Sequence, residues 1–175
     1  MTPGRNKLYT VFPFKKLNLD RFKKSTDGLI EFAAILEQAS PEDRERIMGQ
    51  VREQDPDFLI MAMRKAVFFE ELTYLSEGIL AEVLSKTSPK VLAFAIHGES
   101  VAFRQVFLRH LGLKEIKELK DEEEKMKVIP SAGFKLGARA QVLEVGRRLE
   151  REGKIVFELD DCPRLTPKRK RRAMK

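Results

Sequence analysis

The sequence predicts an all-α protein in which successive short helices form a stacked array. The first observation is that apolar residues recur at helical spacing through most of residues 28–127. The second is that Ser-Pro or Asp-Pro pairs stand at 40–41, 55–56 and 88–89. Serine or aspartate at an N-cap accepts hydrogen bonds from free backbone amides, and proline suits the first helical position. Short helices with brief connections are typical of a stacked helical array.

Length and composition narrow the class of protein. The 175 residues suffice for one domain or two small ones with a packed core. No apolar run approaches the roughly 20 residues that span a bilayer, and no cleavable signal is recognisable. The single cysteine, Cys162, forms no internal disulfide, which suits a reducing compartment. We therefore expect a cytoplasmic protein.

The formal charge of +7 is divided unevenly along the chain. Residues 1–24 and residues 168–175 each have a net charge of +6, whereas residues 25–167 have −5. An acidic body with basic ends argues against a nucleic-acid groove on the folded surface. The basic cluster at 168–172 is a weak signal, since such a tail can bind phosphate or anionic lipid, or only keep an acidic body in solution.

Residues 1–27 are predicted to form a basic, aromatic arm. Pro3, Gly4 and Pro13 interrupt any long helix, and aromatic and aliphatic residues are interleaved with lysines. The preferred interpretation is an extended arm whose aromatic side chains pack onto the body. The alternative is peripheral contact with an acidic membrane surface, which basic and aromatic residues together favour.

The helices that follow are defined by apolar spacing and by their stop signals. Gly98, Gly112 and Gly153 stand where helices are expected to end. Residues 154–159 suit a short strand or a strand-like edge. In the last helix the arginines are expected to be exposed: Arg147, Arg148 and Arg151. The expected helices cover residues 29–39, a segment from 41 onward, 56–65, 77–86, 89–97, 99–111, 113–127 and 134–152.

The helix at 113–127 is the most highly charged. Its narrow apolar stripe consists of Leu113, Ile116, Leu119 and Met126. The rest of its surface is a wide charged face exposed to water. From the residues alone, the simplest interpretation is a solvated helix with ion pairs four residues apart. The acidic run at 121–124 is a poor cage for a hard cation, because consecutive helical residues point in different directions.

No catalytic constellation emerges from the sequence. His97 and His110 are the only histidines, and neither lies in a His-Glu-x-x-His motif. The chain has no P-loop, no dinucleotide-binding glycine fingerprint and no Cys-x-x-Cys pair. His97 before Gly98 is most simply a helix C-terminal residue that the helix dipole favours. We predict a non-enzymatic protein with no metal, no cofactor and no small-molecule substrate.

Residues 64–98, RKAVFFEELTYLSEGILAEVLSKTSPKVLAFAIHG, resemble the carboxy-terminal part of the flagellar motor switch protein FliG. The family has a Met-Phe-x-Phe-Glu-Asp hinge, matched here by residues 66–71, and a later Lys-Gly pair, matched by His97 and Gly98. The resemblance covers about residues 28–159 and implies an armadillo-like stacked helical array in two parts joined by a hinge. Other matching segments are 28–65, 103–107 and 147–156.

On this resemblance the chain divides into five segments. Val67, Phe68 and Phe69 become the expected hinge residues. The segments are a basic aromatic arm (1–27), an armadillo-like helical repeat (28–65), the hinge (66–72), a C-terminal helical domain (73–159) and a disordered basic tail (160–175).

The resemblance also implies a contact face. In FliG a charged helix contacts the stator protein MotA and transmits torque, and Lys, Arg and paired Asp residues form its ridge. By position this ridge falls on four residues here, of which the last three keep the family's charge: His97, Lys114, Asp121 and Glu122. The implied partners are FliM-like and FliG-like switch proteins and a MotA-like stator protein, at the cytoplasmic face of the inner membrane.

Two other hypotheses stay open. In the first, a helical adaptor keeps the fold without a torque role, because Ala66 replaces the hinge methionine and His97 the ridge lysine. In the second, the basic ends bind nucleic acid or a membrane surface. The acidic body makes nucleic acid the less favoured partner.

Overall fold

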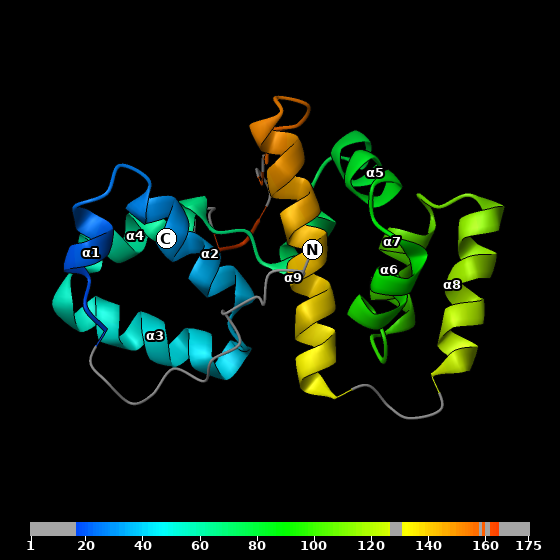
Figure 1. Cartoon of the computed structure of the whole chain (residues 1–175), viewed down its shortest axis with the longest axis horizontal. Helices are drawn as coiled ribbons and strands as arrows, with labels where there is room; N and C mark the ends of the chain where they lie inside the picture. The colour runs from blue at the N-terminus through cyan, green and yellow to red at the C-terminus, as the bar shows by residue number, and fades with distance from the viewer. Residues whose placement is uncertain (1–16, 127–130, 158, 160–161, 165–175) are drawn as a thin grey trace, which may run out of the picture.

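The computed structural model describes residues 17–126, 131–157, 159 and 162–164. All regular structure in these residues is helical, which confirms the predicted all-α class (Figure 1). Most of the predicted arm and tail, and residues 127–130, lie outside the described residues. The elements are α1 (Asp20–Lys23), α2 (Gly28–Gln38), α3 (Pro41–Gln54), α4 (Pro56–Lys65), the 3-10 helix η2 (Phe69–Tyr74), α5 (Glu77–Ser85), α6 (Pro89–Ala95), α7 (Val101–Leu108), α8 (Leu113–Lys125) and α9 (Ala132–Arg151).

The predicted helix starts are present as hydrogen-bonded caps. Ser40 accepts from the amide of Asp43 at 3.1 Å, and Asp55 accepts from the amide of Phe58 at 2.9 Å. Ser88 caps α6 in the same way, with the amide of Val91 at 3.2 Å. Each cap is followed by a proline in the first turn. These local signals therefore fix where three of the helices begin.

Two expectations about helix ends and strands are wrong. Gly98 and Gly153 have φ values of 71° and 69° and do end helical segments, but Gly112 has φ −72° and is the N-cap of α8. Its amide donates to the side chain of Glu115 at 2.6 Å, so it starts α8 instead of ending α7. Residues 154–157 form no strand, and Ile155 is instead buried in the core.

The helices enclose two separate hydrophobic cores. The first core lies among α1 to α4, where the centre of the Phe32 ring is 5.4 Å from the centres of both the Phe22 and the Phe58 ring. The second core lies among η2 and α5 to α9, where Phe69 stacks on Phe107 at 5.3 Å. In Figure 1, α9 stands between the α1–α4 group and the helices α5 to α8, and it packs against both α2 and α6.

A matched pair of glycine substitutions tests the packing of the first core. A Cβ atom on Gly28 would lie 1.8 Å from the backbone oxygen of Phe22, whereas a Cβ on Gly49 would meet nothing within 4 Å. We expect Gly28→Ala to lower the free energy of unfolding by about 2 kcal/mol, because the α1–α2 turn must shift. Gly49→Ala should raise it by about 0.5–1 kcal/mol, because alanine is the better helix former. Urea unfolding of both variants measures these changes, and equal effects would contradict this packing.

Candidate functional site

Two of the predicted ridge residues project from one face of α8. Lys114 and Asp121 are seven residues apart, which places them two turns apart on the same side of a helix. Both are exposed, and the Lys114 side chain is 88% accessible. The nearest opposite charge to Lys114 is Glu118 on the same helix, with an N–O distance of 3.8 Å. An exposed ion pair such as Lys114–Glu118 is weak. The exposed charges of Lys114 and Asp121 are therefore accessible to a binding partner.

Glu122 lies on the flank of that face and already has a partner. Lys125 donates to its carboxylate at 2.8 Å, and the Glu122 side chain is only 24% exposed. This hydrogen bond holds the pKa of Glu122 below its ordinary value, and the positive charge of Lys90 on α6 acts in the same direction. The next residue, Glu123, pairs with Arg104 of α7 at 2.7 Å and so attaches α8 to α7.

His97 lies on a different element from these charges. It is half-buried in the turn that follows α6, at the position before Gly98. Among the ion pairs and side-chain hydrogen bonds of residues 17–126, none joins His97 to α8. The structure thus brings Lys114 and Asp121 onto one face, with Glu122 beside them, and places His97 on a different element.

The predicted hinge residues lie between the two cores. Residues 66–68 are not helical, and their side chains alternate in direction. Ala66 and Phe68 are buried in the first core, while Val67 and Phe69 are buried in the second. All four are at most 6% exposed. This short linker is therefore part of both cores at once.

Two buried carboxylates hold the backbone of this linker. The amide of Val67 donates to Glu37 at 2.8 Å, and the amide of Phe68 donates to Glu71 at 3.0 Å. Glu37 and Glu71 are the buried charged residues of the described part of the chain. A buried carboxylate is costly unless a cation and further hydrogen bonds compensate it. Both carboxylates therefore require cationic partners.

Arginines from distant parts of the chain supply these cations. Arg147 of α9 binds Glu37 and donates to the carbonyl of Lys65 at 2.6 Å. Arg164 donates to the two oxygens of Glu71 at 2.5 and 2.8 Å. We call residues 66–69 together with Glu37, Glu71, Arg147 and Arg164 the joint.

The prediction that Arg147 is exposed is wrong. Its side chain is 19% exposed, because it reaches across the joint to Glu37. Its position four residues after the buried Leu143 was the available sequence signal. Nothing in the local sequence indicates that Glu37, Glu71 and Arg164 also belong to the joint.

The two carboxylates differ in how fully they are compensated. Burial raises the pKa of Glu37, although hydrogen bonds from Arg147 and Val67 oppose this shift. Burial would also raise the pKa of Glu71, but the hydrogen bonds from Arg164 and Phe68 outweigh it and hold this pKa below its ordinary value. Glu71 is therefore the carboxylate whose charged form stabilises the folded protein.

Arginines also cover the aromatic rings of the joint. The Arg44 guanidinium lies 3.7 Å from the centre of the Phe68 ring, and that of Arg164 lies 4.7 Å from it. Arg139 lies 4.8 Å from the Phe69 ring. Cation–π contacts of this kind are strongest where water is excluded, as it is around these rings.

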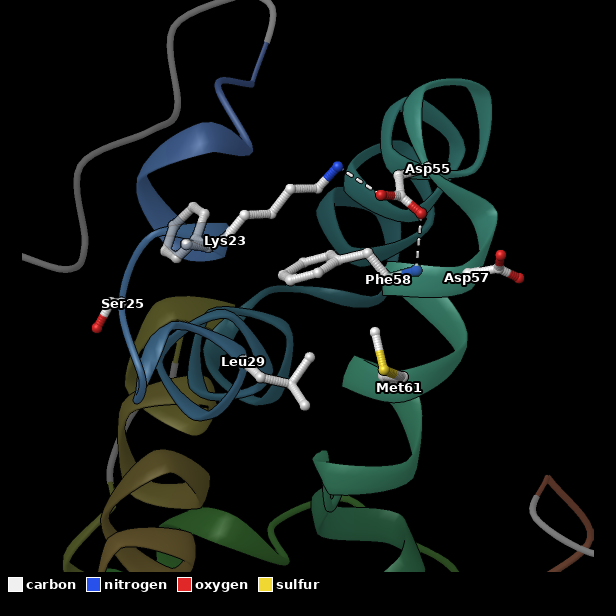
Figure 2. Close-up of a pocket in the computed structure, with 8 residues that line it drawn as sticks. Lys23, Ser25, Leu29, Asp55, Asp57, Phe58 and Met61 are labelled. Carbon is white, nitrogen blue, oxygen red and sulfur yellow. Dashed lines mark hydrogen bonds and ion pairs between the residues drawn. The ribbon is translucent and has the colours of Figure 1, made fainter.

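Two hollows lie on the surface of the described residues. A pocket of about 430 Å³ lies beside α1, α2 and α4. In Figure 2, Lys23 binds Asp55 at this pocket, and Asp55 also caps α4 through the amide of Phe58. A second hollow lies between α6 and α9, where Phe94 stacks on Phe134 with ring centres 6.4 Å apart. Within the described residues, no three His, Cys, Asp or Glu side chains are grouped to hold a metal, and no helix is long and apolar enough to cross a membrane.

A known protein family matches the helices α4 to α9 of this array. The FliG C-terminal domain family matches residues 49–157, which is more than half of the chain. The chain belongs to this family. The match begins within α3 and includes the linker of the joint, α8 and α9. The predicted resemblance to FliG and the armadillo-like fold are therefore confirmed.

Two relatives of this FliG-family chain are the flagellar motor switch protein FliG of two bacteria. FliG of Thermotoga maritima is 24% identical over 130 residues, which cover 74% of this chain and 38% of that protein. FliG of Aquifex aeolicus is 25% identical over 129 residues, covering 74% of this chain and 39% of that protein. The chain thus spans less than two fifths of the length of these curated relatives.

Family membership also bears on the absence of catalytic chemistry. The FliG C-terminal domain is a non-enzymatic flagellar switch domain, so the prediction of a non-enzymatic protein is confirmed. The five-segment division and the roles of the ridge and hinge residues stay predictions.

The Glu37–Arg147 contact can be tested by removing its cation. Arg147→Ala should lower the free energy of unfolding by about 2–3 kcal/mol, because it leaves the Glu37 carboxylate buried without its partner. The neighbouring Arg148 is exposed, so Arg148→Ala should change it by no more than about 0.5 kcal/mol. Urea unfolding compares the two variants, and similar effects would refute the buried contact.

Acid should destabilise the protein through Glu71. Because the folded-state pKa of Glu71 lies below its ordinary value of 4.5, its stabilising effect is complete above that pH and is lost as the pH falls below it. Glu71→Gln should therefore be less stable than the wild type at neutral pH, and its stability should fall less on acidification. Unfolding free energies measured between about pH 6 and pH 3 test this. The exposed Glu124→Gln is the control, and an unchanged acid dependence in Glu71→Gln would exclude the mechanism.

Proposed function

We propose that this protein is a component of the flagellar rotor or switch complex, or an accessory to it, and that it contacts stator or other switch proteins through α8. Its family membership supports a place in the switch complex. The observation that carries the contact is the exposure of Lys114 and Asp121 on one face of α8, inside the segment that the family matches. Glu122 adds negative charge on the flank of this face.

The contact mechanism is electrostatic steering and alignment. Exposed charges of opposite sign two turns apart suit a partner whose charges have the complementary pattern. Each exposed pair contributes little free energy, so binding through such a face is fast, reversible and sensitive to salt. A MotA-like stator protein is the proposed partner of the face. FliM-like and FliG-like switch proteins would hold the rest of the chain in the rotor, at the cytoplasmic face of the inner membrane.

The proposed hinge gives α8 a defined orientation. Because α8 belongs to the second core, the joint sets its direction relative to α1 to α4. Val67, Phe68 and Phe69 are the residues about which the two parts would turn. Movement there would expose apolar side chains, so two packed arrangements are favoured over a continuous range.

A second candidate function is an adaptor without a torque role. It is favoured by the local pairing of Glu122 with Lys125 and by the half-buried position of His97, where the family's ridge has the charge of a lysine. In that case the switch proteins are the partners, and the charged face of α8 keeps the protein in solution.

Charge reversal on α8 separates these functions. In a strain whose swimming depends on this protein, we expect Lys114→Glu, and separately Asp121→Lys with Glu122→Lys, to reduce swimming speed while a fluorescent fusion still joins the rotor. Reversal of the facing charge in the stator protein should restore part of the speed. Lys120→Glu reverses another exposed charge of α8 that points about 100° away from Asp121 around the helix, and it is the matched control.

Normal swimming of both reversed variants would rule out the torque contact and leave the adaptor. Loss of the fusion from the rotor would instead place α8 in the assembly contact.

A further inference from the structure

Residues 162–164 return from the end of α9 to the joint. Arg164 donates to the carbonyl of Met63 and, at 2.7 Å, to the carbonyl of Ala66. The same guanidinium binds both oxygens of Glu71. One side chain therefore connects the last turn of α4, the linker and η2.

The C-terminal end of α4 explains why an arginine suits this position. The last four carbonyls of a helix have no partner within the helix, and cations are favoured beside them. Arg164 binds the carbonyl of Met63, and Arg147 binds that of Lys65. The end of the first part of the chain is thus capped by arginines that come from α9 and from residues beyond it.

Glu71 depends on the same arginine. Its carboxylate accepts the amide of Phe68 and lies 3.4 Å from the sulfur of Cys162, and the whole residue is only 8% exposed. Without Arg164, this buried charge loses the cation to which it is directly bonded, and Phe68 loses one of the two guanidinium groups over its ring. The amide of Phe68 then donates to a buried carboxylate that has lost its cation, and such a group is more stable when it is exposed to water or protonated.

The two arginines differ in how they are anchored. Arg147 belongs to the 20-residue helix α9, whose backbone is held in place by packing against α2 and α6. Arg164 belongs to a short non-helical segment whose other described anchor is the buried Cys162. It can therefore leave Glu71 while every helix stays folded.

From these contacts we infer that residues 162–164 form a strap that locks the joint. With Arg164 in place, the linker is fixed and the two cores keep one relative orientation. Release of Arg164 loosens the linker at Phe68 and removes one of the two arginine contacts, with Arg147, that hold the linker between the α8-bearing part and α1 to α4. This inference concerns the joint and does not depend on the rotor role.

Amide hydrogen exchange measured by NMR on the full chain tests the strap. Arg164→Ala should speed exchange at the amides of Val67 and Phe68 on the order of tenfold or more, because local opening becomes easier. Exchange at the core amides of Leu92 and Leu119 should stay within about twofold of the wild type. Arg164→Lys should give an intermediate result, because lysine keeps the charge but cannot bridge Glu71 and two carbonyls.

A pair of truncations provides the matched control. Deletion of residues 162–175 removes the strap and should reproduce the exchange pattern of Arg164→Ala. Deletion of residues 165–175 keeps Arg164 and should leave the exchange at Val67 and Phe68 unchanged.

Three results would overturn the strap. The first is unchanged exchange at Phe68 in Arg164→Ala. The second is an equal acceleration at Leu92 and Leu119, which would mean that Arg164 only stabilises the whole fold. The third is unfolding of both Arg164→Ala and Arg164→Lys, since a releasable strap leaves the helices folded.

Discussion

The hydrogen bonds from the linker amides to two buried carboxylates are the constraint on which the rest of the structure depends. Val67 and Phe68 are buried, so their amides need acceptors, and Glu37 and Glu71 supply them. A buried carboxylate in turn needs a cation. Arg147 satisfies this need from α9. A requirement that begins with backbone amides thus fixes how the last long helix lies against the first core.

This arrangement links the interior of the protein to its charged surface. The helix α9 packs against α6, and α6 packs against α8. The same α9 contacts α2 and provides the cation for Glu37. The exposed face of α8 therefore has its direction set by contacts that lie far from it. A joint of this kind can orient a weakly binding charged face, because packed interfaces favour discrete arrangements.

The local features of the fold could be predicted from the sequence because their causes lie within a few residues. Ser40, Asp55 and Ser88 cap helices through amides three residues ahead, so the sequence itself contains both partners. Gly112 was assigned to the wrong helix, because glycine suits both a helix end and an N-cap. The strand expected at 154–159 did not form in the described residues of that segment. A strand needs a neighbouring strand, and the described residues provide none.

The candidate site also has a part that the sequence predicts and a part that only the tertiary contacts decide. The shared face of Lys114 and Asp121 follows from helical periodicity, and the resemblance to FliG singled out these positions. Sequence alone therefore determined the helical class, most helix starts and the face of α8. The tertiary structure decided which charges are buried and which are free. The contacts that hold the joint connect residues 30, 93 and 110 positions apart in the chain. Periodicity and capping act over about four residues, so only folding brings these carboxylates, amides and arginines together.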